Sequence, residues 1–254
     1  MSLIPFSYSN SIGKTPGVSR AFISGFCKDV QIANLPQTIW PGVGLMPVFT
    51  VAQSLEVVST DPNDTFGGTG LNIVRIGLRN FNYDSVTLNL NMNGLTPVPL
   101  PGGPYIGTRI LNTVASPTGV NQGDILIRVV GGVVLDIMPA KLGFRKTCAH
   151  IVTREETNDV LYIQAGIYHP TKKDVSAIIS TRQVFADGTT RQELQFPISS
   201  HSISPVLMGE GAVFISLGSM NQFSLEVADI SDNGVEIYAS MSLLQWTLQA
   251  RLSL

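Results

Sequence analysis

The side chains best suited to chemistry in this sequence are its cysteines and histidines. Cys148, His150 and His169 offer three atoms of the kind that zinc prefers. Cys148 and His150 are two residues apart, so on a strand both would lie on one face. A structural zinc site takes four ligands, commonly from paired short spacings, and only one such pair occurs here. We therefore expect the histidines to lie in a core or an interface, with no metal bound.

Aspartates in turn-rich segments form a second candidate set, because loop carboxylates are ligands for Ca²⁺. Asp61 and Asp64 make one group, and Asp229 and Asp232 make another. The first pair matches no calcium-loop spacing. Aspartate side chains also cap turns by accepting hydrogen bonds from nearby backbone amides, and we expect that role here. The sequence alone does not decide whether Ca²⁺ binds.

A glycine-rich run at residues 67–70 raises the question of phosphate binding. It lacks the Lys-Ser/Thr pair of a nucleotide loop and opens a strand rather than a helix, so it is interpreted as a tight turn. Hydrolysis is also disfavoured: no Gly-x-Ser-x-Gly occurs, and a strand would send the neighbours Glu155 and Glu156 to opposite faces. We expect a protein that is not an enzyme and needs no cofactor.

The elements around these residues have the two-residue period of strands. Between residues 86 and 93 apolar and polar side chains alternate strictly, and Asn93-Gly94 then predicts a turn. Residues 235–248 form the longest alternation, whose phase changes at Leu243-Leu244, as a bulge would cause. No segment has a sustained helical period with caps. The sequence predicts an all-β protein with two β-sandwich or jelly-roll-like units.

The chain divides by composition into three parts. Residues 1–46 contain scattered prolines and glycines and predict an extended N-terminal arm. Residues 47–139 are expected to form a first β-sandwich domain, and residues 140–254 a second, jelly-roll-like domain. The first residues have no basic region followed by an apolar core, so no secretory signal is expected, and no apolar run reaches the length of a membrane helix.

Charged residues make up only 13% of the chain, against about 25% in an average soluble protein, while 44% of the residues are hydrophobic. Such a chain must hide much of its surface or cover it with partners. The net charge of -2 gives no basic stripe for nucleic acid, and no nucleic-acid or membrane partner is expected. The two cysteines, Cys27 and Cys148, are expected to be buried, reduced thiols.

A set of short motifs stands in one order in the half of the chain that follows the arm. The motifs are Val57-Val58-Ser59-Thr60, Asn63-Asp64-Thr65, Gly67-Gly68-Thr69-Gly70, Val74-Arg75-Ile76-Gly77-Leu78, Asn82-Tyr83, Leu90, Asn93-Gly94, Thr96-Pro97-Val98, Arg109-Ile110-Leu111 and Asn121-Gln122-Gly123-Asp124-Ile125. This set resembles a module of structural proteins in tailed bacteriophages. The chain departs from that module at Arg79-Asn80-Phe81 and at Ser85. The resemblance implies a protein of the virion without giving its place there.

The arm is too apolar to be an ordinary solvated tail. Aromatic side chains on an irregular segment suit a strap that lies along another subunit, and packing on the chain's own domain is the alternative. The residues expected to anchor such a strap are Phe6, Tyr8, Phe22, Phe26 and Trp40.

The sequence therefore predicts a virion structural protein on the capsid exterior, which decorates or cements the capsid by binding the major capsid protein. A homotrimer is the expected oligomer. One alternative is a receptor- or glycan-binding protein of the tail or a fibre, which would use the polar face of Thr87, Asn89, Asn91 and Asn93. Another is an adaptor of the tail or portal region.

Overall fold

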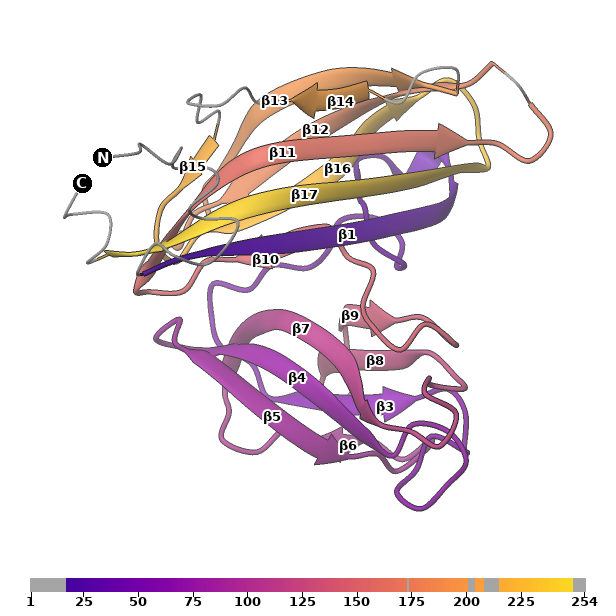
Figure 1. The fold of residues 1–254 in the computed structure, drawn as a ribbon, viewed down its shortest axis with the longest axis vertical. Helices are drawn as coiled ribbons and strands as arrows, with labels where there is room; N and C mark the ends of the chain where they lie inside the picture. The colour runs from indigo at the N-terminus through magenta and orange to yellow at the C-terminus, as the bar shows by residue number, and fades with distance from the viewer. Residues whose placement is uncertain (1–16, 173, 201–203, 208–214, 249–254) are drawn as a thin grey trace, which may run out of the picture.

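The computed structural model describes residues 17–172, 174–200, 204–207 and 215–248 of the 254-residue chain. Over these residues the backbone forms strands that build a larger and a smaller unit (Figure 1). No helix in these ranges is long and apolar enough to cross a membrane. The all-β fold predicted from alternation and turn signals is confirmed.

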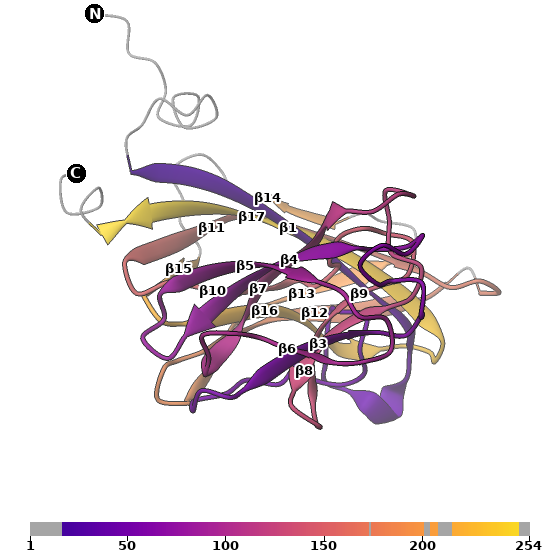
Figure 2. The ribbon, with the colours of Figure 1, turned by 90° about the horizontal axis from the view of Figure 1, so that it is seen from below.

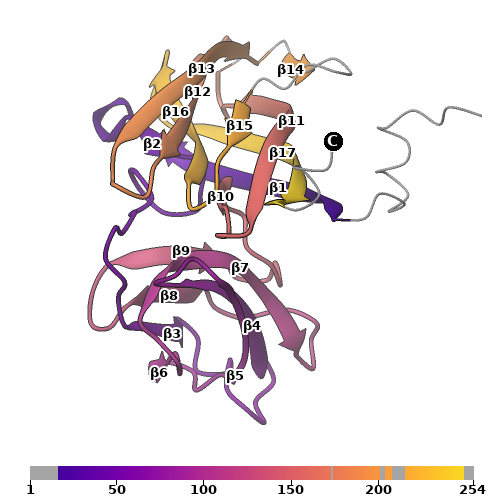
Figure 3. The ribbon, with the colours of Figure 1, turned by 90° about the vertical axis from the view of Figure 1, so that its left-hand side faces the viewer.

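The larger unit is a sandwich of two antiparallel sheets, seen edge-on in Figure 3. One sheet has the order β1-β17-β11-β14, with β15 also paired to β11, and the other has the order β10-β16-β12-β13, with β2 beside β16. With β14 and β15 taken as one position, this is the strand order of a jelly roll. The jelly-roll-like architecture predicted for the C-terminal part is thereby confirmed. Its strands are β1 (Val18–Val30), β2 (Gln37–Thr38), β10 (Ala149–Ile151), β11 (Glu156–Tyr168), β12 (Ser176–Val184), β13 (Thr190–Ser199), β14 (Ser204–Leu207), β15 (Ile215–Leu217), β16 (Gln222–Ile230) and β17 (Val235–Thr247).

The smaller unit is a second sandwich, inserted in the chain between β2 and β10. Its sheets have the orders β6-β3-β8-β9 and β5-β4-β7, and it lies in front of the larger unit in Figure 2. A separate apolar cluster, which includes Leu55, Ile76 and Leu111, forms its core. The strands are β3 (Leu55–Ser59), β4 (Ile73–Asn80), β5 (Ser85–Asn91), β6 (Val98–Pro99), β7 (Tyr105–Ala115), β8 (Ile125–Val129) and β9 (Val134–Met138).

Strand β5 shows how the alternation produces the smaller sandwich. Leu88 and Leu90 pack against the core of that unit, while Thr87 and Asn89 between them are exposed. Gly94 has a φ of 57°, the left-handed conformation that the Asn-Gly turn requires. The half-buried strand predicted here is confirmed.

The bulge expected in β17 lies instead in its neighbour. Val160 of β11 pairs with Leu243 and Tyr162 pairs with Ser242, so the extra residue is on β11. Strand β17 keeps its phase, and Leu243, Leu244 and Trp246 are all buried. Both faces of β17 are covered at this end, and this explains why its apolar residues stop alternating.

The arm expected over residues 1–46 has to be corrected for its described part. Val18–Val30 is not a free strap but strand β1, paired with β17 from Val18↔Trp246 to Val30↔Val235. Cys27 and Val30 are fully buried in the core of the larger unit. Paired residues of β1 and β17 lie more than 200 residues apart in the sequence, so no local sequence pattern predicts this pairing. The first strand of the jelly roll therefore comes from the predicted arm.

The two units meet across an apolar cluster. Trp40, Met46 and Ala149 are buried there, and Val134 and Ile137 of the smaller unit pack against them. The aromatic ring of Trp40 is thus part of the chain's own interior.

Buried polar groups complete the junction between the units. The guanidinium of Arg79, which is fully buried in β4, donates from Nη2 to the carbonyl of Ile151 at 3.2 Å. The fully buried carboxylate of Asp136 in β9 accepts from the Thr147 hydroxyl at 2.8 Å and lies 3.0 Å from Nε of Arg145. These contacts link strands of the smaller unit to β10 and to the segment that leads into it.

Candidate interaction surface

The aromatic anchors predicted for the arm differ in how far their side chains are exposed in the structure. Phe6 and Tyr8 lie outside the described residues. Phe22 is 69% exposed on β1 and remains available to a partner. Phe26 is half-buried, with its ring centroid 6.0 Å from that of Tyr238.

Trp40 is the anchor that the structure removes from the predicted set. Its side chain is only 4% exposed, and Nε1 donates to the carbonyl of Gly44 at 3.0 Å. Its ring has apolar partners on both units, as described above, and its only polar atom is satisfied. Trp40 therefore holds the two units together and cannot reach another subunit.

A pocket lies next to Phe22, where the two units approach each other. Its volume is about 250 Å³. The wall from the larger unit includes Phe22 and Ser24, the wall from the smaller unit includes Leu111 and Asn112, and Phe144 comes from the segment between them. Phe144 is itself 46% exposed, so two aromatic side chains of the pocket face solvent. Arg145 and Thr147 also line this pocket, which is called the junction pocket below.

Strand β1 also leaves part of its backbone unpaired beside the junction pocket. It is the edge strand of its sheet, and the amide of Phe26 points away from β17 to the carbonyl of Lys146, at 3.2 Å. Amide directions alternate along a strand, so the backbone groups of Arg20 and Phe22 point the same way as that of Phe26. No backbone group of the described residues bonds to the outward groups of Arg20 or Phe22. The first half of β1 is thus a free strand edge.

Four of the motifs that carry the phage resemblance, at residues 57–60, 63–65, 67–70 and 121–125, meet around one buried carboxylate. Asp64 is fully buried and accepts four hydrogen bonds: from the amides of Leu71, Gln122 and Gly123, at 2.7 to 2.8 Å, and from the Ser59 hydroxyl at 2.6 Å. It joins loops from three parts of the smaller unit.

The glycines beside Asp64 are required by this close packing. A Cβ on Gly70 would lie 2.3 Å from Oδ1 of Asp64 and 3.0 Å from the Asn63 carbonyl. The interpretation of the glycine-rich run as a tight turn is confirmed. These motif residues shape the loop.

The polar face predicted on β5 is present. Thr87, Asn89 and Asn91 are exposed on one side of this edge strand. Nε of Arg75, on the neighbouring strand β4, donates to Oδ1 of Asn89 at 3.2 Å. The face offers amide and hydroxyl groups to solvent, with one cation beside them.

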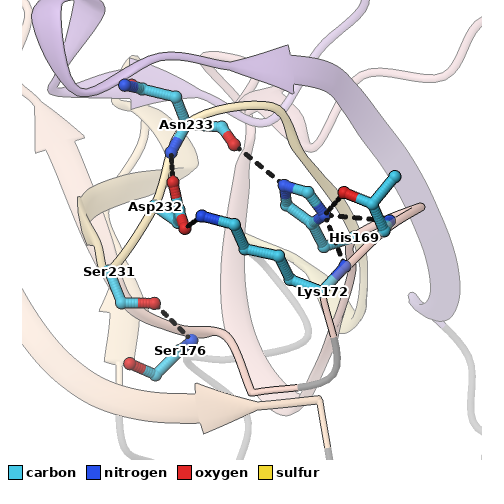
Figure 4. Close-up of polar contacts among 7 residues, drawn as sticks. His169, Lys172, Ser176, Ser231, Asp232 and Asn233 are labelled. Carbon is cyan, nitrogen blue, oxygen red and sulfur yellow. Dashed lines mark hydrogen bonds and ion pairs between the residues drawn. The ribbon is translucent and has the colours of Figure 1, made fainter.

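The candidate zinc ligands are separated. Cys148 and His150 are buried near β10, whereas His169 lies in the exposed turn after β11 (Figure 4). Nδ1 of His169 accepts from the amides of Thr171 and Lys172, and Nε2 lies 3.1 Å from the Asn233 carbonyl. Within the described ranges, no three side chains of the metal-binding types gather into a possible site. The ring of His169 instead ties two neighbouring loops together.

The turn aspartates cap or pair locally. Oδ1 of Asp61 accepts from the Asn63 amide at 2.8 Å, as expected for a turn cap. Asp232 forms an ion pair with Lys172 between the two loops of Figure 4. Both are occupied by groups of the protein.

Neither cysteine has the properties of a nucleophile. Both thiols are free and buried, as predicted. Burial raises the pKa of Cys27 to about 12 and raises the pKa of Cys148 further above its ordinary value. Because the thiolate is the reactive form, both are inert in the folded protein.

The residues that sequence reasoning missed are the buried charges. Asp64 was interpreted as a turn residue, and Arg79 and Asp136 were not singled out. The available signal was a charged residue inside an otherwise apolar strand, as in the runs Ile73–Asn80 and Val134–Met138. Such a residue needs a buried partner, because an unpaired buried charge is strongly unfavourable.

No protein-family model matches the sequence, and no curated protein is similar to it. Solved structures that align along most of the chain are "Structure of infectious bursal disease virus Gt strain" and "Crystal structure of infectious bursal disease virus VP2 subviral particle". Each is 12% identical to this chain and has a TM-score of 0.20; the alignments cover 95% and 96% of this chain and 78% of the viral chains. A TM-score this low carries no argument about the fold or the function.

Proposed function

We propose that this chain is a non-enzymatic structural protein of a bacteriophage particle, which decorates the capsid exterior by binding the major capsid protein. The phage-like motifs in the sequence support the kind of particle. The jelly roll supports it by analogy, since this architecture is frequent in viral capsid and lectin domains. The observation that carries the proposal is the junction pocket, where Phe22 and Phe144 remain exposed in a chain with only 13% charged residues.

Attachment by apolar contacts needs no covalent bond and no catalysed reaction. Burying a large apolar side chain such as Phe22 contributes about 1.5–3 kcal/mol. A homotrimer would present three such contacts to the capsid lattice, and linked contacts multiply the affinity of each one. Weak individual contacts would therefore give firm attachment to a symmetric shell.

The binding test uses capsids of the phage that encodes the chain, prepared without this protein. Phe22→Ala is expected to weaken co-sedimentation with capsids about tenfold or more, since the lost burial exceeds about 1.4 kcal/mol. Phe66→Ala is the matched control, because Phe66 is 64% exposed on a loop that does not line the junction pocket. Equal binding by the wild type and Phe22→Ala would contradict the proposed contact.

Copy number separates the proposal from its rivals. Hundreds of copies in each particle support decoration, whereas about a dozen would support a tail or portal adaptor. The count comes from quantitative mass spectrometry of purified particles, relative to the major capsid protein.

Glycan binding by a tail or fibre protein is the second candidate, because Thr87, Asn89 and Asn91 form an exposed polar face. Amide and hydroxyl groups of this kind bind sugar hydroxyls. A glycan array tests whether this face binds sugars. Binding that Asn89→Ala abolishes would support glycan binding, and the absence of binding would exclude it.

A further inference from the structure

The free edge of β1 and the junction pocket form one continuous acceptor for a strand. The outward backbone groups of Arg20 and Phe22 have no partner among the described residues, and Phe22 also lines the pocket. From Phe26 onward the edge is closed, because Lys146 accepts the Phe26 amide and the backbone of Cys148 lies beside Gly25. A long unpaired edge is a template for pairing with another strand.

The N-terminal residues have the pattern that such an acceptor requires. Apolar side chains stand at Ile4, Phe6, Tyr8 and Ile12, with the polar Asn10 interrupting the series, and the odd positions between 5 and 11 hold one proline and three serines. This two-residue period is that of a strand with one apolar face. Lys14 is the only charged side chain before Gly17, so residues 4–12 can enter the junction pocket without bringing a charge into it.

The length of this segment allows it to reach another subunit. Sixteen residues precede Gly17, and an extended chain of that length spans up to about 53 Å. The thirteen residues of β1 span about 43 Å. The segment starts at the same end of β1 as the free edge, which places the donor and the acceptor close together in a symmetric oligomer.

We propose that residues 4–12 of one copy add as a strand to the free edge of β1 in a second copy. Side chains directly opposite each other on paired strands share a face, so Phe6 or Tyr8 would lie beside Phe22 and enter the junction pocket. The inference rests on the proposed function and takes Phe22 for the contact between copies, so that the capsid lattice would meet the junction pocket at Phe144. Residues 13–16 are also long enough for a turn, so the competing arrangement pairs residues 4–12 with β1 of the same chain.

Photo-crosslinking with isotopically heavy and light copies distinguishes these occupants. The full chain carries benzoylphenylalanine in place of Phe22, and heavy and light copies are mixed, denatured and refolded together before irradiation. The expected product joins position 22 of one isotope to residues 1–16 of the other. Cross-links to this segment only within one isotope, or none to it, would overturn the proposal. Placing the photo-reactive residue at Phe66 is the control and should give no such product.

A backbone variant tests the strand geometry separately. In a chain that carries the photo-reactive residue at position 22, Arg20→Pro removes an outward amide that the chain's own sheet does not use, and proline is tolerated on edge strands. It should abolish the mixed cross-link, whereas Arg20→Ala, which loses the same side-chain bond to Ser242, should retain it. Circular dichroism checks that both variants fold, and equal mixed cross-linking by the two would exclude strand addition. Capsid binding is measured on its own, so a variant that binds capsids without mixed cross-links contradicts only this inference.

Discussion

At the scale of single residues, the buried carboxylate of Asp64 joins four of the motifs that resemble those of phage proteins. Its four hydrogen bonds satisfy three backbone amides and one hydroxyl from separate loops. These motifs form loops that are separated in the sequence, and the loops meet at the Asp64 carboxylate. The sequence indicated turns here, but it could not show that one side chain serves several of them.

Asp64→Asn should destabilise the protein by about 2–4 kcal/mol, because an amide replaces the acceptor of several charge-assisted bonds and leaves donors unpaired. Urea unfolding followed by circular dichroism measures this. Asp61→Asn is the matched control, since Asp61 caps only a local turn, and it should cost less than about 1 kcal/mol. Equal losses for the two variants would refute the role of Asp64 as a node.

The thiols give a prediction about pH. With the pKa of Cys27 raised to about 12, its thiolate fraction at pH 8 is only about 10⁻⁴, and reactivity rises with pH toward that pKa. Native protein should therefore not react with a thiol-specific chromogenic disulfide at pH 8, and denatured protein should release two equivalents. Prompt reaction of the native protein would contradict the burial of these residues.

At the scale of elements, the prediction succeeded where the signal is local and failed where it is not. The alternation in β5 predicted its two faces, because each side chain reports the face on which it lies. The pairing of β1 with β17 has no local signal, since the partners come from opposite ends of the chain. Aromatic residues such as Trp40 were assigned to an exposed strap, although burial against a distant segment produces the same composition.

Gly25→Ala tests whether β1 belongs to the jelly roll. A Cβ at Gly25 would lie 2.5 Å from the amide nitrogen of Cys148 and 2.7 Å from the Ile39 carbonyl, and neither backbone atom can move freely. Overpacking of this kind should cost about 1–3 kcal/mol or more. Gly166→Ala, near the C-terminal end of β11, meets no atom within 4 Å and should be near neutral. Thermal unfolding of both variants measures the contrast, and an unaffected Gly25→Ala would mean that β1 is not seated in the sheet.

At the scale of the whole molecule, one sandwich is inserted into another, and the junction between them is built from the chain's own aromatic and charged residues. The number of predicted strands, with a boundary near residue 139, predicted two units. It could not reveal that the first strand of the second unit precedes the first unit, because sheet topology is decided by contacts between distant segments. The exposed part of the junction is where we place the contact with other proteins.

We propose that this protein attaches to other proteins of a viral particle through the surface around Phe22. A cryo-electron microscopy map of the phage that encodes the chain would test this attachment. We expect many copies on the outer capsid, with Phe22 and Phe144 covered by a neighbouring chain. A capsid without this protein, or copies in which both side chains face solvent, would contradict it.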